Sequence, residues 1–345
     1  MAAAAKDRDP TKIGCFSLDI DGNFHDDDSK KKTFNKPPNY TPDVSVTVKF
    51  DLNKGRMAER RDEQKHEKLD NLLDWISGHK QEIIKDGNTQ TDFVCRRSLL
   101  KEVMSFPFEE NKKLRLDVTL HKGIFYLNKG KYPTENLEQQ DTQQQPQMGR
   151  IEGDWGYKFE QYLTEESTNS VPDMVYNSRE SFYNVMKVKL GSHTIVYSSR
   201  VDAVSADESG EHSVEFKTVK ESKPGTKPFN KYNRYKLRDM WIQSVLGGVP
   251  EIICGLRSVE GKTDTGIVIK LKTYKTEKIP TMKDIPGLWK PDKCWKSLDK
   301  LLTFIKSNVK ENNPSLGLEM QGDDYTIRPP HEFLPETYTT DQPGL

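Results

Sequence analysis

The sequence has few cysteines, no long apolar run and no excess of charge of either sign. Its four cysteines are far apart and form no C-x-x-C pair, which argues against a zinc site and a secreted disulfide framework. The longest apolar stretches, such as residues 247–256, fall well short of the roughly 20 residues that cross a bilayer. The first residues lack the apolar core of a signal peptide. We therefore expect a soluble intracellular protein that binds no membrane.

The balance of charge also limits what the protein binds. Lys and Arg number 53 and Asp and Glu number 53, so any site for a polyanion must be local. The chain has 345 residues, enough for one large or two ordinary domains with a sizeable core. We expect one domain at residues 41–312 with a Gln-rich loop at 131–149, an N-terminal arm at 1–40 and a C-terminal surface segment at 313–345.

Hydrophobic periodicity predicts alternating helices and strands. Helices are expected within 55–83, at 98–106, 156–163, 179–190 and 231–246, and through 295–305; strands are expected at 45–50, 114–122, 123–128, 194–204, 212–220, 250–257 and 265–274. The Lys122-Gly123 step between two of these strands suggests a hairpin. This order is typical of an α/β fold in which helices flank mixed β-sheets.

Two charged triplets lie on neighbouring predicted strands, Arg-Val-Asp at residues 200–202 and Glu-Phe-Lys at 215–217. Residues two apart point to the same face of a strand, so the charged ends of each triplet share a face. A hairpin would bring Asp202, Glu215 and Lys217 to one side of a sheet. An Asp followed by Glu-x-Lys is the minimal pattern of the PD-(D/E)xK nuclease superfamily. Solvent-facing charges on two ordinary strands give the same pattern.

Carboxylates and a lysine in this pattern suit phosphodiester hydrolysis. The substrate is an anion, so its hydrolysis needs hard cations that neutralise developing charge and activate water, and Mg²⁺ or Mn²⁺ bind through carboxylate oxygens. The Lys217 ammonium can orient or deprotonate that water and stabilise the transition state. Glu160, on the helix that precedes these strands, offers a further acid.

Several further motifs occur in one order along the chain. They are Gly14-Cys15-Phe16-Ser17, Glu67-Lys68-Leu69-Asp70, Phe93-Val94 with Arg97, Leu99 and Leu100, Gly156-Tyr157-Lys158-Phe159-Glu160, Leu190-Gly191-Ser192-His193, Val201-Asp202, Glu215-Phe216-Lys217-Thr218, Lys236-Leu237 with Trp241-Ile242-Gln243-Ser244, and Gly248-Val249-Pro250 with Gly255-Leu256-Arg257. Together they closely resemble the DXO family of decapping and exoribonuclease enzymes, which includes the fungal partner of the nuclear 5′–3′ exoribonuclease. The resemblance runs from about residue 13 to residue 275.

The resemblance implies a single α/β domain with two sheets, a PD-(D/E)xK nuclease-like core and a pocket that faces RNA 5′ ends. Members of the family remove incomplete or non-standard caps, including NAD caps, release pyrophosphate from triphosphate ends, and in many cases degrade RNA 5′ to 3′. It further implies Mg²⁺ or Mn²⁺ as cofactor and RNA with a capped, modified or triphosphorylated 5′ end as partner. A nuclear 5′–3′ exoribonuclease is a second candidate partner, and the expected location is the nucleus or cytoplasm.

The resemblance also assigns roles to individual residues. The family's metal ligands match the side chains of Glu160, Asp202 and Glu215 and the carbonyl of Phe216; the positions that orient phosphate and nucleophile match Lys217 and Gln243; the segment that grips RNA phosphates matches Arg96, Arg97 and Ser98; and other substrate contacts match Glu67 and Tyr183. Catalysis is thus expected from Glu215, Lys217 and Gln243.

Three of the polar residues also have structural interpretations. Arg97 fits an ordinary surface arginine at a helix start, although its guanidinium fork suits a phosphate. Gln243 fits a satisfied amide in an apolar helix face. His193 invites a general-base proposal, but a structural histidine is the favoured interpretation.

The sequence departs from the family pattern at Arg200, where an acid is usual. Arginine has five N–H donors and no lone pair to give, so it cannot ligate Mg²⁺, and its charge repels a metal from the same pocket. Two function classes therefore fit. One is an RNA 5′-end nuclease with altered metal occupancy, favoured by the retained acids, Lys217 and Gln243. The other is a pseudo-enzyme that binds RNA ends, nucleotides or a protein partner without chemistry, favoured by Arg200.

Overall fold

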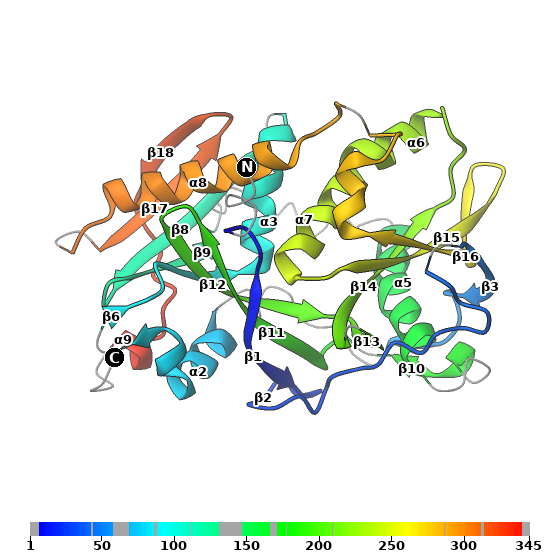
Figure 1. The fold of residues 1–345 in the computed structure, drawn as a ribbon, viewed down its shortest axis with the longest axis horizontal. Helices are drawn as coiled ribbons and strands as arrows, with labels where there is room; N and C mark the ends of the chain where they lie inside the picture. The colour runs from blue at the N-terminus through cyan, green and yellow to red at the C-terminus, as the bar shows by residue number, and fades with distance from the viewer. Residues whose placement is uncertain are drawn as a thin grey trace.

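Two β-sheets, one of nine strands and one of five, organise the protein (Figure 1). A computed structural model describes residues 7–42, 44–57, 69–85, 88–110, 112–130, 147–165, 171–176, 178–208, 210–285, 287–311 and 314–339. The α/β architecture expected from the sequence, with mixed sheets flanked by helices, is confirmed.

The nine-stranded sheet runs in the order β18-β17-β8-β9-β7-β12-β11-β1-β2. Its strands are β1 (Thr11–Leu18), β2 (Phe24–His25), β7 (Phe93–Arg96), β8 (Lys113–His121), β9 (Ile124–Lys129), β11 (Ser181–Leu190), β12 (His193–Val201), β17 (Ser315–Gln321) and β18 (Asp324–Arg328). The expected hairpin is confirmed as β8–β9, and its two turn residues have positive φ, 48° at Lys122 and 78° at Gly123. Positive φ at both central residues matches the right-handed twist of the flanking strands.

The five-stranded sheet runs in the order β13-β14-β15-β16-β3. Its strands are β3 (Val46–Asp51), β13 (Ala203–Asp207), β14 (Gly210–Lys220), β15 (Glu251–Glu260) and β16 (Thr263–Lys275). Two small pairs complete the strands, β4 (Arg56–Met57) with β10 (Val175–Tyr176) and β5 (Ile84–Lys85) with β6 (Asn88–Thr89).

A layer of helices joins the two sheets through one apolar core. It contains α3 (Arg97–Ser105), α7 (Leu237–Gly247) and α8 (Pro291–Asn308), and it receives side chains from both sheets. Because strand side chains alternate, Phe93 and Cys95 of β7 enter this layer, as do Ile252 and Cys254 of β15. α7 touches β12 of one sheet and β15 of the other, and both are interior strands, so this helix packs between the two sheets.

The outer faces of the sheets carry separate cores. Val94 of β7 points away from the helix layer into a cluster with α2 (Asp70–Gly78), and Ile253 of β15 points to α5 (Gln147–Thr164). The short helices α6 (Lys227–Lys231) and α9 (Glu336–Thr339) lie at the periphery (Figure 1). Within the described ranges, no helix is long and apolar enough to span a membrane.

One sequence expectation about secondary structure was wrong. The segment around 179–190 is strand β11 rather than a helix, because this strand lies between β12 and β1 and is buried on both faces. Burial on both faces hides the alternation that marks a strand. Part of the arm at 1–40 is the strand β1, and the segment at 313–345 contains β17 and β18. The domain boundaries themselves stay a prediction.

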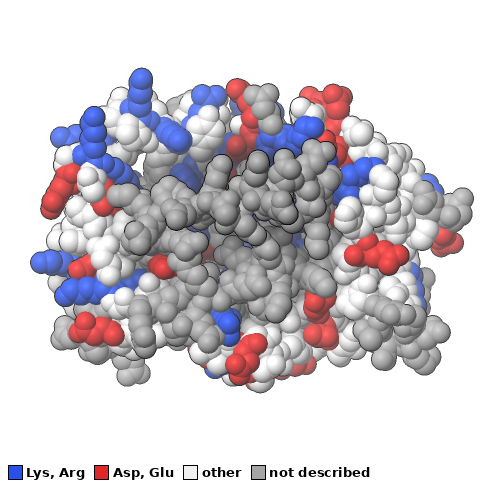
Figure 2. Space-filling model, turned by 180° about the vertical axis from the view of Figure 1, so that it is seen from behind, with Lys and Arg blue, Asp and Glu red and all other residues white. Residues whose placement is uncertain are grey.

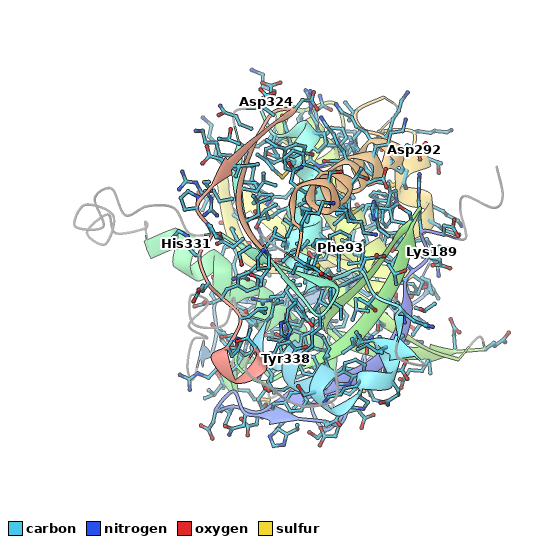
Figure 3. All side chains as sticks on the ribbon, turned by 90° about the vertical axis from the view of Figure 1, so that its left-hand side faces the viewer. Phe93, Lys189, Asp292, Asp324, His331 and Tyr338 are labelled. Atoms are coloured by element: carbon cyan, nitrogen blue, oxygen red, sulfur yellow. The ribbon has the colours of Figure 1, made fainter. Side chains whose placement is uncertain are left out.

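The C-terminal segment lies along one side of the nine-stranded sheet. Figure 3 shows it running from Asp324 past His331 to Tyr338. The backbone N–H of His331 donates to Asp117 Oδ1 at 3.0 Å, and the hydroxyls of Tyr338 and Tyr126 are 3.0 Å apart. These contacts fix the segment to β8 and β9.

Gly14 of β1 packs directly against Trp75 of α2. A Cβ at this position would lie 2.2 Å from Cζ2 of Trp75, which is buried beneath the helix. We expect Gly14→Ala to lower the free energy of unfolding by about 1–3 kcal/mol, because the indole must shift within a packed core. Gly78→Ala at the end of α2 is the matched control, since a Cβ there meets nothing within 4 Å. Urea unfolding of both variants checks the prediction, which equal stabilities would contradict.

Candidate active site

Three acids come together where the two sheets meet. Glu160 belongs to α5, Glu215 belongs to β14, and Asp202 is the one residue between β12 and β13. All three are buried. The chain therefore leaves the nine-stranded sheet and enters the five-stranded sheet at an acid.

The strand register sets Asp202 opposite Glu215. Ala203 of β13 pairs with Val214 of β14, so the next residues outward along the antiparallel ladder are Asp202 and Glu215. The backbone N–H of Phe216 donates to Asp202 Oδ2 at 2.9 Å. The hairpin expected between residues 194–204 and 212–220 is thus wrong in one respect. Only β13 pairs with β14, while β12 belongs to the other sheet, because the chain changes sheet at residue 202.

Glu215 and Lys217 point to the opposite side of β14 from Phe216, as the alternation predicted. Lys217 Nζ donates to Glu215 Oε1, and the Gln243 amide Nε2 donates to the same oxygen at 2.5 Å. Arg97 Nη1 lies 3.5 Å from Glu215 Oε2. The Phe216 ring packs edge-on against Phe159, with centroids 6.2 Å apart. The structure therefore brings Arg97, Glu215, Lys217 and Gln243 into one cluster.

Arg200 occupies the space between the other two acids. Its Nη2 is 2.6 Å from Glu160 Oε2, and its Nη1 is 3.2 Å from both Glu160 Oε1 and Asp202 Oδ1. The guanidinium carbon also lies 5.6 Å from the centre of the Tyr157 ring, within the range of a cation–π contact. The forked contact to Glu160 has the geometry in which guanidinium and carboxylate bind each other most strongly.

Lys101 is a member of the cluster that sequence reasoning missed. It lies one helical turn after Arg97 on α3, and its Nζ donates to Gln243 Oε1 at 3.2 Å. This contact fixes the Gln243 amide so that its NH₂ faces Glu215. The available signal was the i, i+4 spacing from Arg97, which puts the two cations on one face of a helix.

The remaining predicted residues lie apart from the acids or outside the described residues. Arg96 and Ser98 line a small cavity on another face of α3, together with Glu102 and Lys129. Tyr183 pairs with Arg200 across β11 and β12, and its ring stacks on Phe16 with centroids 4.9 Å apart. Glu67 lies outside the described residues. The substrate contacts assigned to these positions stay predictions.

His193 is a structural histidine, as expected. It is buried, and its Nε2 lies 3.1 Å from the Thr303 hydroxyl of α8. Burial lowers its pKa, with a smaller contribution from Lys306. Its described contacts are with the α8 side of the sheet, so it serves packing.

Crowding of the acids changes their protonation. Burial, together with the carboxylates of Glu215 and Glu160, raises the pKa of Asp202 to about 7. Burial alone would also raise the pKa of Glu215, but Lys217 and Arg97 outweigh it and lower that pKa to about 2. Although burial opposes it, pairing with Glu160 and Asp202 raises the pKa of Arg200. Asp202, which faces Glu215, therefore keeps its proton up to a pH close to neutral. Arg200 stays charged.

The acids Glu160, Asp202 and Glu215 suit a hard divalent cation, but the positive charge of Arg200 between two of them opposes its binding. Three carboxylates offer the oxygen ligands that such a cation prefers, and the Phe216 carbonyl stays a predicted ligand. Among the described residues, however, no three His, Cys, Asp or Glu side chains are arranged to hold a metal ion, since Arg200 separates Glu160 from Asp202. Glu215 would hold the ion together with Asp202 and Glu160, once Arg200 moves away from the latter two.

The chain is similar to known proteins in both its sequence and its fold. A family model described as RAI1 like PD-(D/E)XK nuclease matches residues 8–339. The human Decapping and exoribonuclease protein is 31% identical over 321 residues, which cover 90% of this chain and 77% of the human protein.

Two solved structures of fungal proteins are similar to this one. Candida albicans Rai1, in complex with pU5-Mn2+, has a TM-score of 0.75 at 19% identity and covers 93% of this chain and 89% of its own. Scheffersomyces stipitis Rai1, in complex with (3'-NADP)+ and calcium ion, has a TM-score of 0.74 at 20% identity and covers 92% and 89%. At these identities the likeness bears on the fold alone.

The raised pKa of Asp202 predicts how stability changes with pH. Its protonated carboxyl stabilises the folded protein below the ordinary pKa of 3.8, and this contribution is lost as the pH rises to about 7. Asp202→Asn retains an acceptor for the Phe216 N–H but carries no charge. We expect the free energy of unfolding of the variant, relative to the unmodified protein, to rise by on the order of 2 kcal/mol from pH 5 to pH 8. Urea unfolding in EDTA at both pH values tests this. An equal change in the free energy of unfolding of the two proteins between pH 5 and pH 8 would contradict it.

Proposed function

The chain belongs to the family of RAI1-like PD-(D/E)XK nucleases, and on that premise we propose that it is a metal-dependent hydrolase of RNA 5′ ends. Its substrates are RNAs with incomplete or non-standard caps, including NAD caps, or with 5′ triphosphates, and 5′–3′ exoribonuclease activity follows the first cleavage. The observation that carries the proposal is the convergence of Asp202 and Glu215 with Lys217 and Gln243 at the junction of the two sheets.

Each residue of the cluster has a part in that reaction. A bound Mg²⁺ or Mn²⁺ supplies neutralisation of phosphate charge and activation of water. Lys217, held against Glu215, orients the attacking water and stabilises charge on the phosphate. Gln243 is fixed on both sides, by Lys101 and by Glu215, so it keeps the Glu215 carboxylate in one rotamer. Arg97 approaches the same carboxylate and offers its remaining N–H groups to RNA phosphates.

Related proteins support the choice of substrate. The human relative is a decapping and exoribonuclease protein, and the two fungal neighbours were solved with a ribonucleotide ligand and manganese or with a dinucleotide and calcium. By this likeness we also propose a nuclear or cytoplasmic location and a nuclear 5′–3′ exoribonuclease as a protein partner.

A second function, binding of RNA 5′ ends without hydrolysis, is favoured by Arg200 alone. Its guanidinium bridges Glu160 and Asp202, and a metal ion has to displace it to gain these ligands. A guanidinium neutralises phosphate but generates no nucleophilic hydroxide. In the first function the metal ion displaces Arg200 from Glu160 and Asp202, and in the second function it does not.

Hydrolysis should depend on Glu215. We expect Glu215→Ala to abolish Mn²⁺-dependent release of product from 5′-labelled triphosphorylated or NAD-capped RNA, because the variant loses a metal ligand and the partner of Lys217. Glu211→Ala, at an exposed site on the same strand, is the control and should retain activity. Product release that continues in EDTA, or in Glu215→Ala, would rule out the metal-dependent mechanism.

Metal binding should respond to Arg200. We expect Arg200→Glu to tighten Mn²⁺ binding in calorimetry and to raise hydrolysis about tenfold or more, a change of about 1.4 kcal/mol in the barrier, because a ligand replaces a competing cation. Arg200→Gln removes the charge without supplying a carboxylate and should lie between the two. If the unmodified protein hydrolyses such ends rapidly and Arg200→Glu is no faster, Arg200 belongs to a working site.

A further inference from the structure

The junction of the sheets carries more positive than negative groups. Its acids are Glu160, Asp202 and Glu215, and its cations are Arg97, Lys101, Lys217 and Arg200. A carboxylate cluster repels phosphate until a metal ion binds, whereas this cluster already has the opposite sign.

Two of the cations, Arg200 and Lys217, are more accessible than any of the three acids, whereas Arg97 is buried like them. The side chains of Arg200 and Lys217 are 27% and 28% exposed, whereas those of Glu160, Asp202 and Glu215 are 11%, 4% and 2% exposed. An approaching ligand therefore meets guanidinium and ammonium groups before it meets a carboxylate. Figure 2 shows Lys and Arg interspersed with Asp and Glu over the described part of one face. The whole chain has no formal net charge, so an excess of positive charge at the junction is a local feature.

Two of these cations have N–H groups without a hydrogen-bond partner among the described residues. The contacts of Arg200 with acids use Nη1 and Nη2, which leaves Nε–H among the five donors of a guanidinium. Lys101 donates to Gln243 Oε1 at 3.2 Å and forms no ion pair with a described residue. Burial lowers its pKa, and the neighbouring Lys217 adds to the effect, so an anion placed here would relieve repulsion between cations.

We propose that this cluster binds the terminal phosphate of a 5′-phosphorylated RNA without any divalent cation, with Arg200 in the role of the ion. The phosphate lies against Arg200 and Lys217, and Lys101 and Arg97 supply the remaining positive charge. This binding does not require hydrolysis, and it rests on the proposed function only in taking RNA as the ligand. Arg200 is thus a specificity residue for phosphorylated ends, and Lys101 is a binding residue on α3.

The test compares two oligoribonucleotides of one sequence, with a 5′ phosphate or a 5′ hydroxyl, by fluorescence anisotropy in EDTA. We expect the unmodified protein to prefer the 5′ phosphate about tenfold or more. Arg200→Gln and Lys101→Met should each reduce this preference several-fold, while Lys300→Met, at an exposed site of α8, should leave it unchanged. Thermal unfolding of every variant shows that the comparison is between folded proteins.

Arg200→Glu gives the sharpest outcome. This variant should lose the preference in EDTA and regain it when Mn²⁺ is added, because the ion then takes the place of the guanidinium. A preference that needs Mn²⁺ in the unmodified protein, or that persists in Arg200→Gln, would overturn the proposal. Failure of Mn²⁺-dependent hydrolysis with an intact preference in EDTA would instead count against the proposed function alone.

Discussion

The hydrogen bond from the Phe216 N–H to the Asp202 carboxylate holds the architecture of the site together. It lies at the single residue that connects β12 of the nine-stranded sheet to β13 of the five-stranded sheet. The bond is buried, so removing either partner leaves a polar group without compensation. It also places Asp202 against β14 next to Glu215, and the paired strands then set Lys217 on the same face. One backbone contact thereby joins the two sheets and fixes the acids relative to each other.

Burial of these acids explains why Arg200 is compatible with a stable fold. Three carboxylates removed from water repel one another and lose solvation, and without cations nearby they would protonate or destabilise the protein. Lys217 and Arg97 neutralise Glu215, and Arg200 neutralises the other two. Relative to the acid that the resemblance led us to expect at this position, an arginine changes the charge of the cluster by two units. The same residue thus stabilises the metal-free protein and weakens its attraction for a cation.

Strand alternation made much of the site predictable from the sequence. Glu215 and Lys217 share a face and Phe216 takes the other, which needs only the geometry of one strand. The change of sheet at Asp202 was not predictable, because no local signal separates β12 from β13. The β11 strand was missed because burial on both faces removes its alternation. Lys101 was missed because its role depends on Gln243, a residue far away in sequence. Local periodicity thus predicts which side chains share one face of a helix or strand, whereas long-range packing decides which of these faces meet.

The strength of the Arg200 contacts decides how binding and hydrolysis separate in this protein. A hydrogen bond to a charged group contributes about 1.5–3 kcal/mol net, and a metal ion must displace Arg200 from both Glu160 and Asp202. Arg200 makes three such hydrogen bonds, which amount to about 4.5–9 kcal/mol, or roughly three to six orders of magnitude in metal affinity. Phosphate binding bears no such cost, since the anion approaches a guanidinium that keeps its contacts with the acids. Recognition of phosphate is therefore a property of the protein alone, while hydrolysis depends on the concentration of the metal ion.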